Sequence, residues 1–109
     1  MSHTHYFQLL SKPSNNQINK FLKGVRSIIN SSNVLIVDGF GEADTTPSIT
    51  KDYISFNGCG DDSCESMYID FTDLSWSFCK TNRMPYDGVV VKVLELAQET
   101  MNFKWSATH

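Results

Sequence analysis

The feature that most constrains this fold is an amphipathic pattern over residues 15–30. Ser14 and Gln17 stand in front of it in a capping-box arrangement, which predicts that a helix begins there. The apolar residues of the pattern recur at helical spacing, and they are Ile18, Phe21, Leu22, Val25, Ile28 and Ile29. Because a helix with one apolar stripe needs a second layer to cover it, the chain has to build a layered domain.

A second helix is predicted from near Pro85 to near Met101. Proline is acceptable as a first helical residue, and Asp87 in the first turn would complement the helix dipole. The stripe of this helix consists of Tyr86, Val89, Val90, Val93, Leu94, Ala97 and Met101.

Short stretches of alternating or continuous apolar residues predict strands around the two helices. They cover residues 6–10, 34–37, 53–57, 67–71, 76–79 and 103–106. The run Val34–Val37 is apolar throughout, so we expect a central strand covered on both faces, and residues 38–50 form a long loop. The strand side chains expected to face the helices are Phe7, Leu9, Ile54, Phe56, Met67, Ile69, Phe71, Trp76 and Phe78. Those expected on the opposite face are Ser55, Asn57, Tyr68, Asp70, Ser77 and Cys79.

These elements define the fold class. Their order is β-α-β-β-β-β-α-β, which predicts an α+β two-layer sandwich with a mainly antiparallel sheet and two helices on one face. The 109 residues are 40% hydrophobic, enough for one core, so we expect a single domain over residues 1–109.

Charge and cysteine usage limit the function classes. Nine basic and twelve acidic side chains give a net charge of −3, which makes a nucleic-acid partner an unfavoured prediction. No run is long and apolar enough to span a membrane, so no membrane role is expected. Three cysteines and no signal-peptide pattern predict reduced thiols in the cytoplasm. Both a monomer and a homodimer stay open.

The acidic residues are concentrated in the middle of the chain. Residues 38–74 hold nine acidic side chains and one basic side chain. This block is either a solvated loop surface or an acidic patch that binds a basic partner or a cation.

The segment from Asn57 to Glu65 is the most unusual stretch of the sequence. Cys59 and Cys64, with Cys79 and either His3 or His5, form a possible zinc set, although a second close pair of ligands is missing. The carboxylates of Asp61, Asp62 and Glu65 do not follow an EF-hand pattern, and neighbouring Asp61 and Asp62 would point apart. We therefore expect no metal, no cofactor and no catalytic residue here.

The second unusual segment is Phe78–Asp87, which runs from a strand end into a helix N-terminus. Helix N-termini bind anions, and Lys80, Thr81 and Arg83 would add charge and a hydroxyl group. The alternative is a local turn in which Asp87 caps the helix and Arg83 pairs with an acid such as Glu65.

Both segments carry a resemblance. Phe56-Asn57-Gly58 with Glu65, followed by Phe78-Cys79-Lys80-Thr81, Arg83, Pro85, Tyr86 and Asp87, resembles a family of small uncharacterised proteins associated with phage and prophage genomes. The resemblance covers roughly residues 33–100, with Met84 in place of a basic residue and Cys64 in place of a histidine. It implies an intracellular accessory role in phage biology, located in the host cytoplasm if the protein is phage-encoded, and no assigned activity.

The function expected from the sequence is a binding or inhibitory module that acts on a host or viral protein. Phe40, Tyr53 and Tyr68 would anchor the partner, and carboxylates would steer the encounter. The alternatives are a small-molecule or nucleotide-binding protein, with or without enzyme activity, that uses the Lys80–Asp87 turn, and a zinc-stabilised structural subunit. The candidate binding residues are Asn57, Asp61, Asp62, Glu65, Lys80, Thr81, Arg83, Tyr86 and Asp87.

Overall fold

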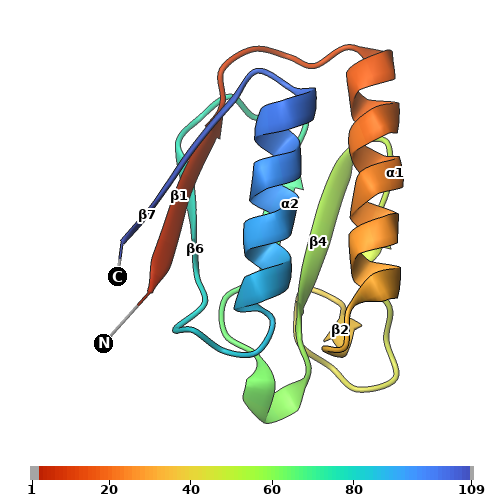
Figure 1. Ribbon diagram of the computed structural model, residues 1–109, viewed down its shortest axis with the longest axis vertical. Helices are drawn as coiled ribbons and strands as arrows, with labels where there is room; N and C mark the ends of the chain where they lie inside the picture. Colours follow the sequence, from red (N-terminus) through yellow and green to blue (C-terminus); the bar gives the residue numbers. More distant parts are fainter. Residues whose placement is uncertain (1–2, 109) are drawn as a thin grey trace.

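A computed structural model describes residues 3–108 and shows two helices packed on one side of a layer of strands (Figure 1). The elements in chain order are β1 (Thr4–Leu9), α1 (Asn15–Ser31), β2 (Ile36–Val37), β3 (Ser48–Ile49), β4 (Tyr53–Gly58), the 3-10 turn η1 (Gly60–Asp62), β5 (Met67–Asp70), β6 (Ser77–Lys80), α2 (Asp87–Thr100) and β7 (Phe103–Thr108). The α+β class and the predicted order of elements are confirmed, with the two-residue β3 as an addition.

Helix α1 begins where the capping box predicts. The Gln17 N–H donates to the Ser14 hydroxyl, and the Ser14 N–H donates to the Gln17 side-chain carbonyl. Four residues of its stripe are buried and two are partly buried, so the whole stripe faces the core. Burial of this stripe, rather than helix propensity alone, stabilises α1.

Helix α2 begins at Asp87, two residues later than predicted. The Met84 N–H donates to the Thr81 carbonyl and the Asp87 N–H donates to the Met84 carbonyl, so Pro85 and Tyr86 belong to the turn before the helix. Every residue of the predicted stripe is nevertheless buried.

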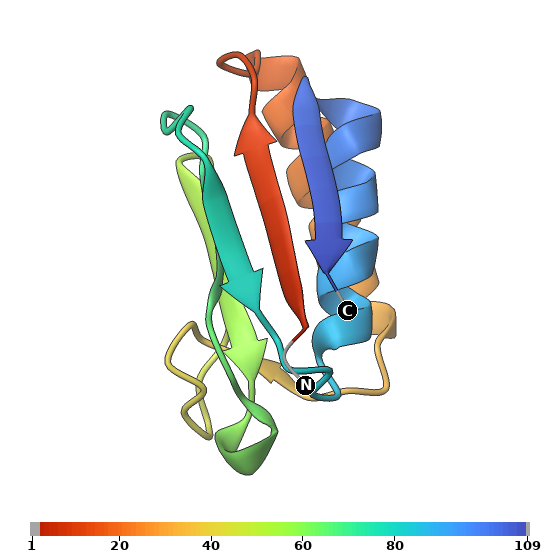
Figure 2. The same cartoon turned by 90° about the vertical axis from the view of Figure 1, so that its left-hand side faces the viewer.

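The strands form two antiparallel sheets instead of the single sheet expected. In one sheet β1 lies between β6 and β7, and in the other β4 pairs with β2, β3 and β5. The two sheets meet where the Glu65 N–H donates to the Lys80 carbonyl. Figure 2 shows β6, β1 and β7 side by side with both helices behind them. One face of the strand layer is therefore covered and the other is open.

The prediction of a central strand over Val34–Val37 is wrong. Only β2 pairs there, at the edge of its sheet, and Leu35 is 66% exposed. Pairing stops at Asp38, whose carboxylate accepts the N–H groups of Phe40 and Glu42 and turns the chain. The predicted long loop over residues 38–50 also contains β3, which pairs with β4.

The predicted facing of residues 76–79 is wrong by one position. Phe78 and Trp76 are 50% and 58% exposed, and Cys79 is buried. The register pairs His5 with Cys79 and Tyr6 with Phe78. Since residues opposite each other in a sheet share a face, Cys79 faces the helices with His5 and Phe78 faces outward with Tyr6. Asn57, also expected on the open face, is buried.

The assignment of faces predicts that the same substitution, phenylalanine to alanine, lowers the free energy of unfolding by different amounts on the buried and the open face. Phe56→Ala should lower the free energy of unfolding by about 3–5 kcal/mol, because Phe56 is fully buried. Phe78→Ala should lower it by about 1 kcal/mol or less, because half of that side chain is already in water. Urea unfolding of both variants measures the difference, and equal losses would contradict the assignment of faces.

Candidate functional site

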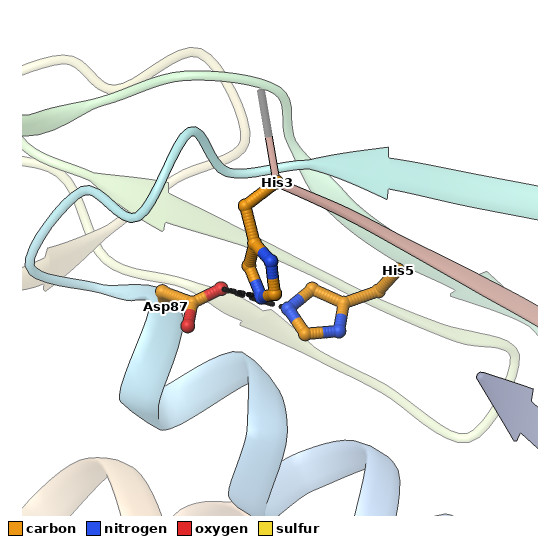
Figure 3. Close-up of side chains that lie close together, drawn as sticks. All are labelled: His3, His5 and Asp87. Carbon is orange, nitrogen blue, oxygen red and sulfur yellow. Dashed lines mark hydrogen bonds and ion pairs between the residues drawn. The ribbon is translucent and has the colours of Figure 1, made fainter. Parts of the chain in front are cut away.

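Three side chains that can bind a metal ion or a proton lie close together between β1 and α2. His3 lies directly before β1, His5 lies on it, and Asp87 is the first residue of α2 (Figure 3). Residues two apart on an extended chain point to the same side, which brings the two imidazoles together. Their rings are 4.7 Å apart, and His3 and His5 are 4% and 0% exposed. We call these three residues the His–Asp cluster.

Oxygen Oδ1 of Asp87 is the centre of a hydrogen-bond network. It lies 2.7 Å from Nε2 of His5 and 3.6 Å from Nε2 of His3, and it accepts the Thr81 hydroxyl at 2.5 Å. On the other side of His5, the Trp105 indole N–H donates to Nδ1 at 3.1 Å. Because an indole nitrogen only donates, Nδ1 must accept, and the proton of neutral His5 lies on Nε2 and points at Asp87.

The Asp87 carboxyl group is held in its ionised form. Burial raises the pKa of this group, but the hydrogen bonds from Thr81 and His5 outweigh burial and lower the pKa below its ordinary value. The N-terminal end of α2 also favours a negative charge at this position. The cluster therefore contains one carboxylate facing two imidazoles.

The turn between β6 and α2 positions Asp87. The N–H groups of Thr81 and Asn82 both donate to the His3 carbonyl, which fastens the turn to the start of β1. Asn82 and Arg83 have φ angles of 51° and 59°, a left-handed conformation that reverses the chain within a few residues. His5 and Asp87 are 82 positions apart in the sequence, and this turn brings Asp87 next to His5.

Several residues predicted for a ligand pocket are used inside the protein instead. Tyr86 is fully buried, its hydroxyl donates to the Glu65 carbonyl, and burial raises the pKa of its phenol. The Glu65 carboxylate accepts the Lys80 backbone N–H at 2.6 Å. Thr81 is fully buried against Asp87, whereas Arg83 is exposed. The segment forms a turn, but α2 has no side-chain cap and the Glu65 carboxylate binds the Lys80 backbone, so the structure shows neither the predicted Asp87 cap nor a pair of Glu65 with Arg83.

Asn57 organises the loop that follows β4. Its side-chain amide donates to the carbonyls of Gly39 and Cys64, and its side-chain oxygen accepts the N–H groups of Gly58 and Cys64. Asp61 and Asp62, predicted beside Asn57 as binding residues, are exposed on η1. Asn57 therefore supports the loop, and the two carboxylates face water.

Replacing Asn57 tests this role. Asn57→Ala leaves four loop groups without their partner and should lower the free energy of unfolding by about 3 kcal/mol. Chemical unfolding of the purified variant measures the loss. The control is Asn33→Ala at an exposed position, which should cost less than about 0.5 kcal/mol, and similar losses would contradict the assignment.

Part of the acidic block serves local turns. Asp70 accepts the N–H and hydroxyl of Thr72, and Asp73 accepts the N–H and hydroxyl of Ser75. The backbone hydrogen bond from Thr72 lowers the pKa of Asp70, and the side-chain hydrogen bond from Ser75 lowers the pKa of Asp73. Together with Asp38, these carboxylates stabilise turns of the exposed loops.

The cysteines and histidines do not form the zinc set that the sequence allowed. All three cysteines are free thiols, and among residues 3–108 the His–Asp cluster is the group with metal-ligand spacing. Cys79 is fully buried and its thiol contacts the Glu65 carbonyl. Burial, with a contribution from Glu65, raises the pKa of the Cys79 thiol to about 12.

The thiols should therefore differ in reactivity. Iodoacetamide at pH 8 should modify Cys79 far more slowly than Cys59 and Cys64, because only a very small fraction of the Cys79 thiol is ionised and it is covered. Peptide mass spectrometry over a time course measures the three rates. In denaturant the rates should converge, and fast native labelling of Cys79 would contradict its burial.

The open face of the first sheet carries stacked aromatic rings. Tyr6 stacks on Trp76 with ring centres 5.3 Å apart, and Trp76 contacts Phe78 at 5.6 Å. We call these three residues the aromatic face. The loop before β6 is held against β1 because the Gln8 side chain donates to the Leu74 carbonyl. A surface pocket of about 350 Å³ opens between Trp76 and β7, lined by Tyr6, Phe7, Gln8, Trp76, Lys104 and Ser106.

Sequence reasoning missed both features. The facing error placed Trp76 and Phe78 in the core, and either His3 or His5 was considered only as a fourth ligand beside the three cysteines. Their spacing of two, next to a predicted strand, was the available signal for a shared face.

Comparisons with protein-family models, curated proteins and solved structures found no match to this chain. The resemblance carried by Phe78–Asp87 therefore stays a prediction. No helix within residues 3–108 combines the length and apolar character that crossing a membrane requires.

Proposed function

We propose that this protein is a binding module that recognises a partner protein through the aromatic face. The observation that carries the proposal is the stack of Tyr6, Trp76 and Phe78 on the side of the sheet away from the helices. Trp76 and Phe78 expose half or more of their surface. Clusters of exposed aromatic side chains are costly in water and are typical of the central residues of protein interfaces.

The aromatic face is ordered before a partner arrives. Tyr6 and Phe78 lie opposite each other on paired strands, and Trp76 packs against both. The hydrogen bond from Gln8 to Leu74 fixes the loop that carries Trp76. Less side-chain freedom is lost on binding to a surface of this kind, so more of the contact energy becomes affinity. The adjoining pocket has room for an apolar side chain of the partner.

The charges around the aromatic face favour a protein over a nucleic acid. Lys104 lines the adjoining pocket, and Asp73 lies in the loop before β6, next to the Leu74 carbonyl that Gln8 contacts. Protein surfaces that bind nucleic acids carry an excess of basic side chains that contact the phosphates, whereas this chain has a net charge of −3. An apolar centre with a rim of both charges is typical of protein–protein interfaces.

The biological setting belongs to the same proposal. The Phe78–Asp87 resemblance supports an accessory role in phage, with inhibition of a host or viral protein as the result of binding. Three free thiols support a reducing compartment such as the cytoplasm. The nucleotide-binding alternative has less support, because Thr81 and Tyr86 are buried and bound to other parts of the chain.

Site-specific photo-crosslinking tests the proposal in cells. A photoreactive phenylalanine analogue at Phe78 should give one discrete protein adduct, identified by mass spectrometry. The same analogue at Glu95, exposed on α2, is the control and should not give it. An identical adduct pattern at both positions, or an adduct to nucleic acid, would contradict the proposal.

The identified partner then allows a quantitative test. Trp76→Ala should weaken its binding by about 30-fold or more, as for a central interface residue. Phe40→Ala is the matched control, because Phe40 is 85% exposed but lies in the loop after β2. If Phe40→Ala abolishes binding and Trp76→Ala does not, the partner docks on that loop and the aromatic face is not the interface.

A further inference from the structure

We infer that the His–Asp cluster is a binding site for one divalent transition-metal ion, with Zn²⁺ as its simplest occupant. This inference is independent of the aromatic face, because it rests on side chains that point to the opposite side of β1. It assigns a role to two buried imidazoles that the binding proposal does not use.

The positions of the donor atoms are close to those that an ion requires. Ligand atoms of His3, His5 and Asp87 all lie within 4.8 Å of one another. Tetrahedral Zn²⁺ with bonds of about 2.0–2.1 Å separates its ligand atoms by roughly 3.3 Å. The distance from His3 Nε2 to Asp87 Oδ1 is 3.6 Å, and the distance from His5 Nε2 to the same oxygen is 2.7 Å. The second distance must lengthen by about half an ångström, and the two imidazole nitrogens, which lie within 4.8 Å of each other, must reach a similar separation. Side-chain rotations provide both changes.

The chemistry of the three donors selects the ion. Two imidazole nitrogens and one carboxylate oxygen suit Zn²⁺ and its first-row neighbours better than Ca²⁺ or Mg²⁺, which prefer oxygen ligands alone. Asp87 accepts hydrogen bonds from the Thr81 hydroxyl and His5, so it presents a carboxylate oxygen to the site. Its negative charge balances part of the charge of the ion.

The site is reachable from solvent. A pocket of about 380 Å³ opens over the two imidazoles and is lined by His3, His5, Val91, Trp105, Ser106 and Ala107. The Asp87 side chain is 21% exposed. Three protein ligands and an opening leave one coordination position for water or a small ligand, which is the arrangement of open rather than purely structural zinc sites.

Trp105 opposes metal binding through its hydrogen bond to His5. Its indole N–H fixes the His5 proton on Nε2, where the ion would bind. An ion at Nε2 displaces that proton, which returns through solvent to Nδ1. The indole N–H must then turn away, because two N–H groups cannot face each other. Metal binding therefore breaks two hydrogen bonds of His5. The ion replaces the one to Asp87, but nothing replaces the one from Trp105, so removal of the indole N–H should strengthen metal binding.

The test titrates Zn²⁺ into the full chain, purified without a histidine tag, in competition with a chromophoric chelator. One ion per chain is expected. His3→Gln and Asp87→Asn each remove a ligand and should weaken binding by more than about 100-fold, since loss of an outer partner alone costs 10- to 100-fold. Circular dichroism and thermal unfolding establish that both variants are folded.

Two controls separate this site from other metal ligands. His109→Gln removes the third histidine of the sequence, which lies outside the described residues, and should leave affinity unchanged. The double variant Cys59→Ser and Cys64→Ser should also bind normally, and the Co²⁺ form should lack a thiolate charge-transfer band. Either a thiolate band or loss of binding in the double variant would overturn the assignment.

Trp105→Phe gives the most specific readout. It keeps an aromatic ring but removes the N–H, and it should tighten Zn²⁺ binding by up to about 10-fold, because one hydrogen bond no longer has to break. Adventitious binding at surface groups would not respond to this change. Absence of Zn²⁺ binding by the wild-type chain, or unchanged affinity in a folded His3→Gln variant, would show that the cluster is a hydrogen-bond network and not a metal site.

Discussion

The hydrogen bonds that converge on the Asp87 carboxylate connect the main parts of the fold. Through His5 they reach β1, through Thr81 they reach the end of β6, and through Trp105 on the far side of His5 they reach β7. Asp87 itself begins α2. Burial of an imidazole and a hydroxyl without partners would cost several kcal/mol, so each group depends on the others being in place. One oxygen atom thus ties a complete sheet to the first turn of a helix.

The helix-facing side of that sheet explains why the remaining side chains face as they do. His5, Phe7 and Leu9 of β1 all point toward the helices, which leaves Tyr6 and Gln8 on the open face. Antiparallel pairing passes the same alternation to β6, where the small Cys79 is buried and the large Phe78 is exposed. Hydrophobicity alone would favour burial of the large Phe78 side chain instead. Cross-strand register decides instead, because a shift of one residue would expose His5 and bury Tyr6.

The helices and the layered class could be predicted from the sequence because their signals are local. A capping box and a stripe of six residues lie within one stretch of chain, and each confirms the other. The strand facing at residues 76–79 could not be predicted, since four residues offer two alternations and only the partner strand chooses between them. The His–Asp cluster depends on a contact 82 residues apart, closed by a left-handed turn at Asn82 and Arg83. Local pattern carries no information on such a contact.

Strand β1 carries both proposed sites on opposite sides of one backbone. Tyr6 belongs to the aromatic face and His5, its neighbour, belongs to the His–Asp cluster. Adjacent side chains of a strand point to opposite faces of the sheet and do not contact each other. Each site can therefore be altered while the other keeps its own neighbours. A metal ion would hold the start of β1 to α2, and it would thereby limit motion in the strand that supports the Tyr6–Trp76 stack. The two sites therefore share a strand, and the contacts that order the aromatic face do not depend on the ion.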